Sequence, residues 1–124
     1  MLDTELGLRL DVERGPDWIF VRVNPPEGSW DEAPPLAEAI WAILEQSFTY
    51  RVVLELDRLP LLRSCLIGQL VMLAKRVHSH DGLLRVCGLS SQNHEVLTAS
   101  RLSTVLPNYH DRGEAVMASR PRPR

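Results

Sequence analysis

Residues 51–77 read RVVLELDRLPLLRSCLIGQLVMLAKRV and contain the two clearest structural signals in this 124-residue chain. The run from Arg51 to Leu56 is almost continuously apolar, which is typical of a central strand covered on at least one face. From about Ser64 to His80, apolar residues recur at helical spacing and form a wide stripe, and basic residues near its end suit the negative end of a helix dipole. We therefore expect a buried strand that leads, through a short connection, into a long amphipathic helix.

The segment upstream of this strand predicts a hairpin and a first helix. Leu8–Val12 and Ile19–Val23 show strand patterns, and the turn-forming residues Glu13–Asp17 lie between them. Residues 24–30 contain prolines and a glycine, which excludes a helix or a central strand there. The first helix should follow, with Asp31 as its N-cap, and should end at residues 47–49.

Downstream of the long helix, the alternation of strand and helix continues. Gly82 is expected as the C-terminal cap of that helix, and Leu83–Gly88 predicts a further strand. The remaining expected elements are a third helix capped by Ser90 or Ser91 and carrying Val96, Leu97 and Leu102, a short edge strand at Val105–Leu106, and a helix over Asp111–Ala118 that packs through Ala115, Val116 and Met117. This order implies right-handed parallel crossovers behind the initial hairpin.

Composition limits the class of protein. The chain is 44% hydrophobic and 24% charged with a net charge of −2, which fits one globular domain over residues 1–119 and an arginine- and proline-rich tail at 120–124 that we expect to be disordered. The acidic balance argues against direct nucleic-acid binding. The sequence has no apolar run long enough for a membrane span and no signal peptide, so a cytoplasmic protein is expected. Cys65 and Cys87 are expected to be small apolar residues rather than a disulfide or a metal site.

The usual motifs of catalysis are missing from the sequence. The glycines fit neither phosphate-binding loop pattern, and no nucleophile elbow is present. His78 and His80 form a close pair, but at this spacing on a helix end their rings point in different directions and no third metal ligand follows. We therefore expect no metal, no cofactor and no enzymatic activity. Glu55, Asp57 and Arg58 follow the central strand, where α/β folds often have sites, although solvated charges are more common.

Ser64 is the strongest candidate for a functional residue, because it stands at the start of the long helix. The simpler interpretation is an N-cap, whose hydroxyl stabilises the helix by about 1 kcal/mol. The other interpretation is a phosphorylation site. The free N–H groups of a first helical turn favour an anion, and a phosphoryl group adds about −1.5 to −2 units of charge that can repel an acidic partner.

Three segments resemble the signature of STAS domains, the family of bacterial anti-sigma factor antagonists and their relatives. Val52–Gly68 resembles the core motif, in which a hydrophobic strand is followed by a short element that opens a helix. Gly82–Ser90 resembles a later strand of the family, and Val96–Leu102 resembles the end of its next helix. Their order and spacing fit the family over nearly the whole chain. The resemblance implies an α/β STAS-like fold, with a mixed, mostly parallel sheet of four to five strands and helices packed mainly on one face.

The resemblance also implies a non-catalytic signalling function by partner switching, in which transcription is regulated through protein contacts. In the family, the unmodified antagonist binds an anti-sigma factor that is also a serine kinase, and phosphorylation of the motif serine breaks the complex. Carried over to this sequence, the phospho-acceptor is Ser64. The residues that the resemblance assigns to partner binding are Leu61, Leu62, Arg63, Cys65, Leu66, Ile67 and Glu27. The sequence leaves a homodimer open.

The sequence departs from the family motif at several positions. Arg63 replaces the motif aspartate before the serine, Leu66 and Arg101 replace glycines, and residues 24–28 replace an acidic loop. Replacing the aspartate with arginine reverses the charge beside Ser64, and such reversals in a contact patch cost several kcal/mol. The alternative is therefore a constitutive protein-interaction module, or a module for a small ligand such as a nucleotide, with no phosphoswitch.

Overall fold

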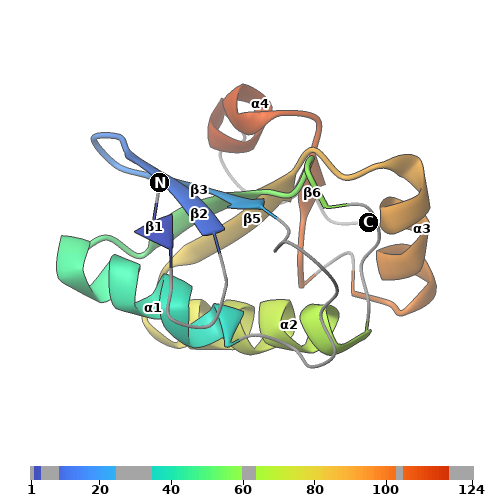
Figure 1. Ribbon diagram of the computed structural model, residues 1–124, viewed down its shortest axis with the longest axis horizontal. Coiled ribbons are helices and arrows are strands. Elements are labelled where there is room, and N and C mark those ends of the chain that lie inside the picture. The colour runs from blue at the N-terminus through green and yellow to red at the C-terminus, as the bar shows by residue number, and fades with distance from the viewer. Residues whose placement is uncertain (1, 4–8, 25–34, 60–63, 103–104, 118–124) are drawn as a thin grey trace.

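The computed structural model describes residues 2–3, 9–24, 35–59, 64–102 and 105–117. In chain order the elements are β1 (Leu2–Asp3), β2 (Arg9–Arg14), β3 (Ile19–Asn24), α1 (Leu36–Ser47), β4 (Arg51–Glu55), α2 (Ser64–Ser79), β5 (Leu83–Cys87), α3 (Ser91–Ala99), β6 (Asn108–Tyr109) and α4 (Arg112–Met117). Figure 1 shows a single sheet with α1 and α2 on one side and α4 on the other. Within these residues, no helix is long and apolar enough to cross a membrane.

The strands form one mixed sheet in the order β1-β2-β3-β4-β5-β6. The pairs β1–β2 and β2–β3 are antiparallel, and the pairs β3–β4, β4–β5 and β5–β6 are parallel. The predicted hairpin, the inner position of β4 and the mostly parallel sheet are therefore confirmed. Among the described residues the sheet has six strands instead of the expected four to five, because each edge carries a strand of only two residues.

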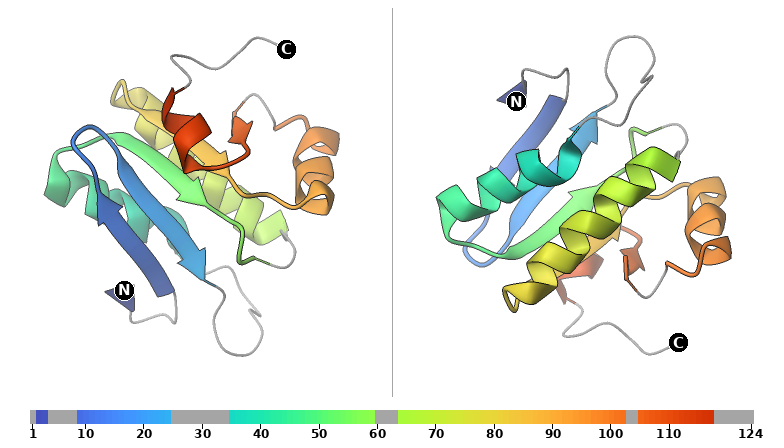
Figure 2. Two further views of the ribbon diagram at one scale, coloured as in Figure 1. Left: turned by 90° about the horizontal axis from the view of Figure 1, so that it is seen from above. Right: turned by 90° about the horizontal axis from the view of Figure 1, so that it is seen from below.

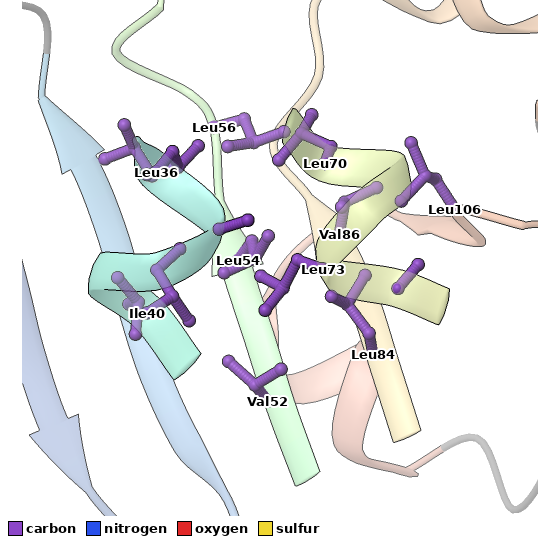
Figure 3. Packing of buried hydrophobic residues seen from close by; sticks show 14 of the residues in the cluster. Leu36, Ile40, Val52, Leu54, Leu56, Leu70, Leu73, Leu84, Val86 and Leu106 are labelled. Carbon is purple, nitrogen blue, oxygen red and sulfur yellow. The ribbon is translucent and has the colours of Figure 1, made fainter. Parts of the chain in front are cut away.

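One face of the sheet carries the main hydrophobic core. Leu54 of β4 is fully buried and is paired with Val21 of β3 and Val86 of β5, so apolar side chains continue across three strands. α1 and α2 lie across this face (Figure 2), and Figure 3 shows their leucine and isoleucine side chains packed around β4. Turning these side chains away from water supplies most of the stability that the fold gains from apolar burial, at about 25 cal/mol per Å².

The opposite face, which we call the back face, is more polar. Its apolar cluster is small and consists of Trp18, Val53, Cys87 and Ala115. α4 covers only the part of this face formed by β4, β5 and β6 (Figure 2). A helix on each face makes the sheet the middle layer, and its two faces differ sharply in chemistry.

The structure corrects two expected helix caps. α1 begins at Leu36 with Pro35 at the N-cap position and no side-chain cap, so Asp31, which lies outside the described residues, does not begin the helix. At the end of α2 the left-handed residue is Asp81, with φ 57°, and not Gly82. Glycine is needed at 82 for space, since a Cβ there would lie 2.1 Å from the carbonyl oxygen of Tyr50.

Two expectations near the C-terminus are also corrected. The edge strand is β6 at Asn108–Tyr109, and Leu106 packs instead in the main core, fully buried. In α4, Ala115 is buried as expected, but Met117 is 83% exposed and does not pack. The expectation for α3 is confirmed at its start, where the hydroxyl of Ser90 accepts a hydrogen bond from the N–H of Asn93.

Candidate functional site

The first turn of α2 follows the carboxyl end of β4, as the sequence predicts. Ser64 is the first residue of α2, and Ser64, Cys65, Leu66 and Ile67 make up its first turn. The predicted contact residues Leu61, Leu62, Arg63 and Glu27 lie outside the described residues, as do the side chains of Ser64 and Cys65. The described part of the site consists of α2 from Leu66 onward and the hydrogen-bonded residues around its N-terminal end.

Leu66 and Ile67 face inward. Leu66 is 1% exposed and Ile67 is 8% exposed, and both belong to the main core. Their side chains hold the first turn of α2 against the sheet and offer little surface to a partner. Gly68 and Met72, further along the same helix, point to solvent, and Met72 is 57% exposed. Helical spacing alone separates these two sets, since residues 66, 70 and 73 share one side of the helix and 68 and 72 share another.

The N-terminal end of α1 lies against the second turn of α2. The side-chain oxygen of Gln69 accepts a hydrogen bond of 3.0 Å from the backbone N–H of Ala37. This bond satisfies one of the free N–H groups at the start of α1, where no side-chain cap is present. It also joins the start of α1, the helix that follows segment 25–34 with Glu27 along the chain, to the helix that Ser64 begins. The two parts of the predicted contact surface are thus linked through described residues.

A polar anchor lies where β3 and β4 end. The guanidinium of Arg58 donates a 2.9 Å hydrogen bond to the side-chain oxygen of Asn24 and lies 3.8 Å from the Asp11 carboxylate. The amide group of Asn24, which is 7% exposed, donates to the backbone oxygen of Arg9 and to Asp11. Asn24 precedes segment 25–34 and Arg58 lies just before segment 60–63. The anchor therefore fixes the entrances of both segments relative to each other.

The turn after β4 is fixed on its other side. The N–H of Leu59 donates to the oxygen of Leu56 at 3.2 Å, and Asn93 of α3 donates to the oxygen of Leu59 at 3.5 Å. Gly88, just after β5, has φ +77°, and a Cβ there would lie 2.9 Å from the Cβ of Asp57. Only glycine combines that backbone conformation with so close an approach. The ends of β4 and β5 are thus in direct contact beside the turn.

A buried carboxylate on the back face connects this turn with α4. Glu55 is 6% exposed and accepts two hydrogen bonds from Arg112, at 3.0 and 2.8 Å, and one from Arg22 at 3.4 Å. Arg22 also contacts Asp57 at 3.2 Å, and Arg112 also contacts Glu13. The sequence suggested that Glu55 is a solvated charge. The structure instead makes it the centre of an ion-pair network whose arginines are far from it in sequence.

The network affects the ionisation of two groups. The hydrogen bond to Glu55 raises the pKa of Arg112 above its ordinary value, so its guanidinium stays charged at any pH the protein tolerates. Burial, assisted by the negative charges of Glu55 and Asp57, raises the pKa of the Cys87 thiol to about 12. Cys87 is therefore a protonated thiol and a poor nucleophile near neutral pH.

The predicted histidine pair has a structural explanation. The ring of His80 lies edge-on to that of Trp41 with centroids 4.6 Å apart and is stacked on that of Tyr50 at 5.4 Å. The guanidinium of Arg76 also lies over the Trp41 ring, 4.6 Å from its centroid. These contacts cover Trp41 at the end of α2. Across the described ranges, no three His, Cys, Asp or Glu side chains are grouped to hold a metal ion.

Comparisons with solved structures identify the fold. An anti-sigma factor antagonist from Mycobacterium paratuberculosis is similar with a TM-score of 0.73 at 21% identity, over 94% of this chain and 97% of the other. A STAS domain protein from Planctomyces limnophilus gives 0.68 at 20% identity, over 88% and 96%. The unphosphorylated form of the Bacillus anti-sigma factor antagonist SpoIIAA gives 0.62 at 15% identity, over 87% and 93%. No family model and no curated protein matches the sequence.

These matches confirm the predicted fold. The chain is similar to STAS-domain anti-sigma factor antagonists over most of its length, and it shares their α/β architecture with a mixed, mostly parallel sheet. At identities of 21% or lower, the likeness concerns the fold and leaves the residues at the start of α2 to be judged on their own chemistry.

Proposed function

We propose that this protein is a non-catalytic bacterial signalling module that binds a protein partner at the N-terminal end of α2, and that phosphorylation of Ser64 releases the partner. The proposed partner is an anti-sigma factor that also acts as a serine kinase. The observation that carries the proposal is a STAS fold in which Ser64 is the first residue of α2, the helix that follows the central strand β4 along the chain.

Hydrogen bonds hold the described residues at the edges of the proposed contact site in place. Arg58 and Asn24 hold together the turn after β4 and the end of β3, and Gln69 joins α2 to the start of α1. A surface that is ordered before binding loses less conformational entropy when the partner arrives. The hydrogen bonds described above therefore lower the entropic cost of binding at the edges of the site.

The chemistry of the first turn of α2 favours a phosphate switch. The turn contains no acidic side chain, and its free N–H groups favour an anion. A phosphoryl group on Ser64 would add about −1.5 to −2 units of charge to a surface that faces a partner. The energy of one such charge in a contact patch is several kcal/mol, which is enough to separate a moderately tight complex.

The test compares three variants in binding to serine kinases of the anti-sigma class from the same cells. Ser64→Asp imitates the charge and Ser64→Ala removes the acceptor. Ser90→Asp is the matched control, because Ser90 caps α3 at another helix N-terminus and aspartate caps as well as serine does. We expect Ser64→Asp to weaken binding at least about tenfold, whereas Ser64→Ala and Ser90→Asp bind as the unchanged protein does.

Phosphate mapping gives the second measurement. Trypsin cuts after Arg63 and Lys75, and Ser64 is the only Ser, Thr or Tyr of the resulting peptide 64–75, so phosphate on this peptide of the protein recovered from stressed cells identifies the acceptor. Phosphate on Ser64 is the expected result. Equal binding of Ser64→Asp and Ser64→Ala, with no phosphate on Ser64 under any stress, would remove the switch and favour the constitutive or ligand-binding module. Arg63, which reverses the charge of the family motif, is the residue that favours this alternative.

A further inference from the structure

The back face contains one buried carboxylate and two guanidinium groups that share it. Arg112 binds Glu55 through two short hydrogen bonds, at 3.0 and 2.8 Å, whereas the bond from Arg22 is longer, at 3.4 Å. The side chain of Glu55 is only 7% exposed, so water cannot replace these partners. A buried charge that loses a partner is strongly destabilised unless another cation takes its place.

Arg22 has a second carboxylate within reach. Its Nε atom lies 3.2 Å from Asp57, whose side chain is 46% exposed. Asp57 lies in the turn closed by the hydrogen bond from Leu59 to Leu56, and the same turn leads toward Ser64. Arg22 thus contacts two carboxylates. Glu55 is buried and depends on Arg22 for its charge if Arg112 leaves, whereas water can solvate Asp57.

α4 is the element that is suited to move. It has six residues, far below the roughly 12–15 at which isolated helices become stable, so its structure depends on docking. Its contacts with the sheet include the ion pairs of Arg112, the Arg112 guanidinium 4.3 Å from the centroid of the Phe20 ring, the small cluster around Ala115, and a hydrogen bond from Arg85 to the Ala115 oxygen. Arg112 is the first residue of α4, where the helix dipole disfavours a cation. Its position is explained by the carboxylates of Glu55 and Glu13.

We infer that α4 controls the turn before Ser64 through competition between Glu55 and Asp57 for Arg22. With α4 docked, Arg112 neutralises Glu55, and Arg22 is available to hold Asp57. With α4 undocked, Glu55 draws Arg22 away, and the turn from Leu56 to Leu59 loosens. Arg22 and Arg112 are therefore positioning residues. The consequence for partner binding rests on the proposed function, whereas the coupling itself does not.

The difference in burial between Glu55 and Asp57 determines which of the two carboxylates binds Arg22 more strongly. An exposed ion pair such as Arg22–Asp57 contributes little, because water and salt solvate both charges. Glu55 has no such compensation on the covered face. When Arg112 is absent, the arrangement of lowest free energy therefore moves Arg22 toward Glu55, and Asp57 loses its partner.

The experiment uses the isolated full chain and needs no partner. It compares Arg112→Met, Glu55→Gln and the double variant with the unchanged protein. Hydrogen exchange of the Leu59 amide reports the turn. Alkylation of Cys87, mapped by peptide mass, reports whether α4 covers the sheet, since Cys87 is 3% exposed and packs with Ala115. Arg112→Gln, which also removes the charge but keeps a polar side chain, replaces Arg112→Met if the latter does not fold.

The double variant separates coupling from general damage. Arg112→Met should alkylate at Cys87 about tenfold faster and should exchange at Leu59 about two- to fivefold faster, as expected for loss of an exposed ion pair. In the double variant residue 55 is an uncharged glutamine and does not attract Arg22. Exchange at Leu59 should therefore return to the original rate while Cys87 stays reactive. Unchanged exchange in Arg112→Met, or exchange in the double variant as fast as in the single one, would overturn the inference. Neither result depends on Ser64.

Discussion

The two faces of the sheet are stabilised in different ways. Under α1 and α2, neighbouring strands present apolar side chains such as Val52, Leu54 and Val86, all fully buried. On the back face, the same strands present Glu55 and Arg85, which are buried but polar. Apolar burial adds stability in proportion to area, whereas buried ion pairs recover little more than the cost of removing their charges from water. The face under α1 and α2 therefore supplies stability, and the ion pairs of the back face fix the positions of particular side chains.

The difference can be followed along β4, since successive side chains point to opposite faces. Leu54 joins the main core, and Glu55, the next residue, joins the ion-pair network. Figure 1 shows the consequence, with long helices on one side and the short α4 on the other. An element held by polar contacts can be released at lower cost than one held by a core. The back face is thus the place where regulation is expected.

The largest expected effect comes from the apolar face. Leu54→Ala should lower the free energy of unfolding by about 3–4 kcal/mol, because it leaves a cavity in a fully buried position. Urea unfolding measures the change. Arg51→Ala, on the exposed start of the same strand, is the control and should change stability by about 0.5 kcal/mol or less. If Val53→Ala on the back face costs as much as Leu54→Ala, the contrast between the faces is wrong.

The next effect is a loss of stability at alkaline pH on the back face. The pKa of Cys87 is raised from an ordinary value near 9 to about 12 in the folded protein. Below pH 9 the thiol is protonated in both states and contributes no pH dependence. Between pH 9 and 12 only the unfolded chain releases the proton, so each pH unit should cost about 1.4 kcal/mol.

Unfolding in urea at pH 8 and at pH 10.5 measures this alkaline effect. Cys87→Ala is the control, since it removes the titrating group while Cys65 remains in both proteins. We expect the unchanged protein to lose about 1–2 kcal/mol more than the variant over this range. Parallel losses in the two proteins would mean that the thiol is not kept from water by α4.

The sequence predicted the apolar face well, because its signals are local. The strand at Arg51–Leu56 and the helix after Ser64 follow from periodicities of two and 3.6 residues, and the structure confirms both elements. Gly82 was expected to cap a helix through backbone freedom, but Asp81 takes that conformation and Gly82 is needed for space beside Tyr50. A contact between segments that are far apart in the sequence, such as Tyr50 and Gly82, cannot be predicted from a local sequence pattern.

The same limit applies to the site. Ser64 could be singled out because it begins a helix after a strand, and the resemblance to STAS domains gave the fold, which the comparisons confirm. Arg112 could not be found in this way, because Glu55 lies 57 residues before it and only the folded chain brings them together. Leu66 was assigned to a contact surface by motif position, whereas its helical phase relative to Leu70 indicates the core where it lies.

Arg112→Met should have a moderate effect on stability. It removes two hydrogen bonds from the buried Glu55, but Arg22 stays within reach and the Arg112 side chain is 34% exposed. We expect a loss of about 1–2 kcal/mol in the free energy of unfolding. Glu13→Gln, which removes the exposed partner of the same arginine, is the control and should cost at most about 0.5 kcal/mol. Equal losses in the two variants would show that the burial of Glu55 does not decide the energy of the network.

The smallest effect is expected on the outward side of α2, and it is a gain. Gly68 is exposed in the helix interior, and a Cβ there would meet no atom within 4 Å. Gly68→Ala should therefore raise the free energy of unfolding by about 0.5–1 kcal/mol, because alanine loses less backbone entropy in a helix. Urea unfolding measures the change. A loss of stability would mean that the outward side of α2 also makes stabilising contacts, so the contrast between the two faces of the sheet would be incomplete. If stability rises but binding to the partner falls, the missing Cβ is what lets the partner approach, and this side of α2 is part of the binding surface.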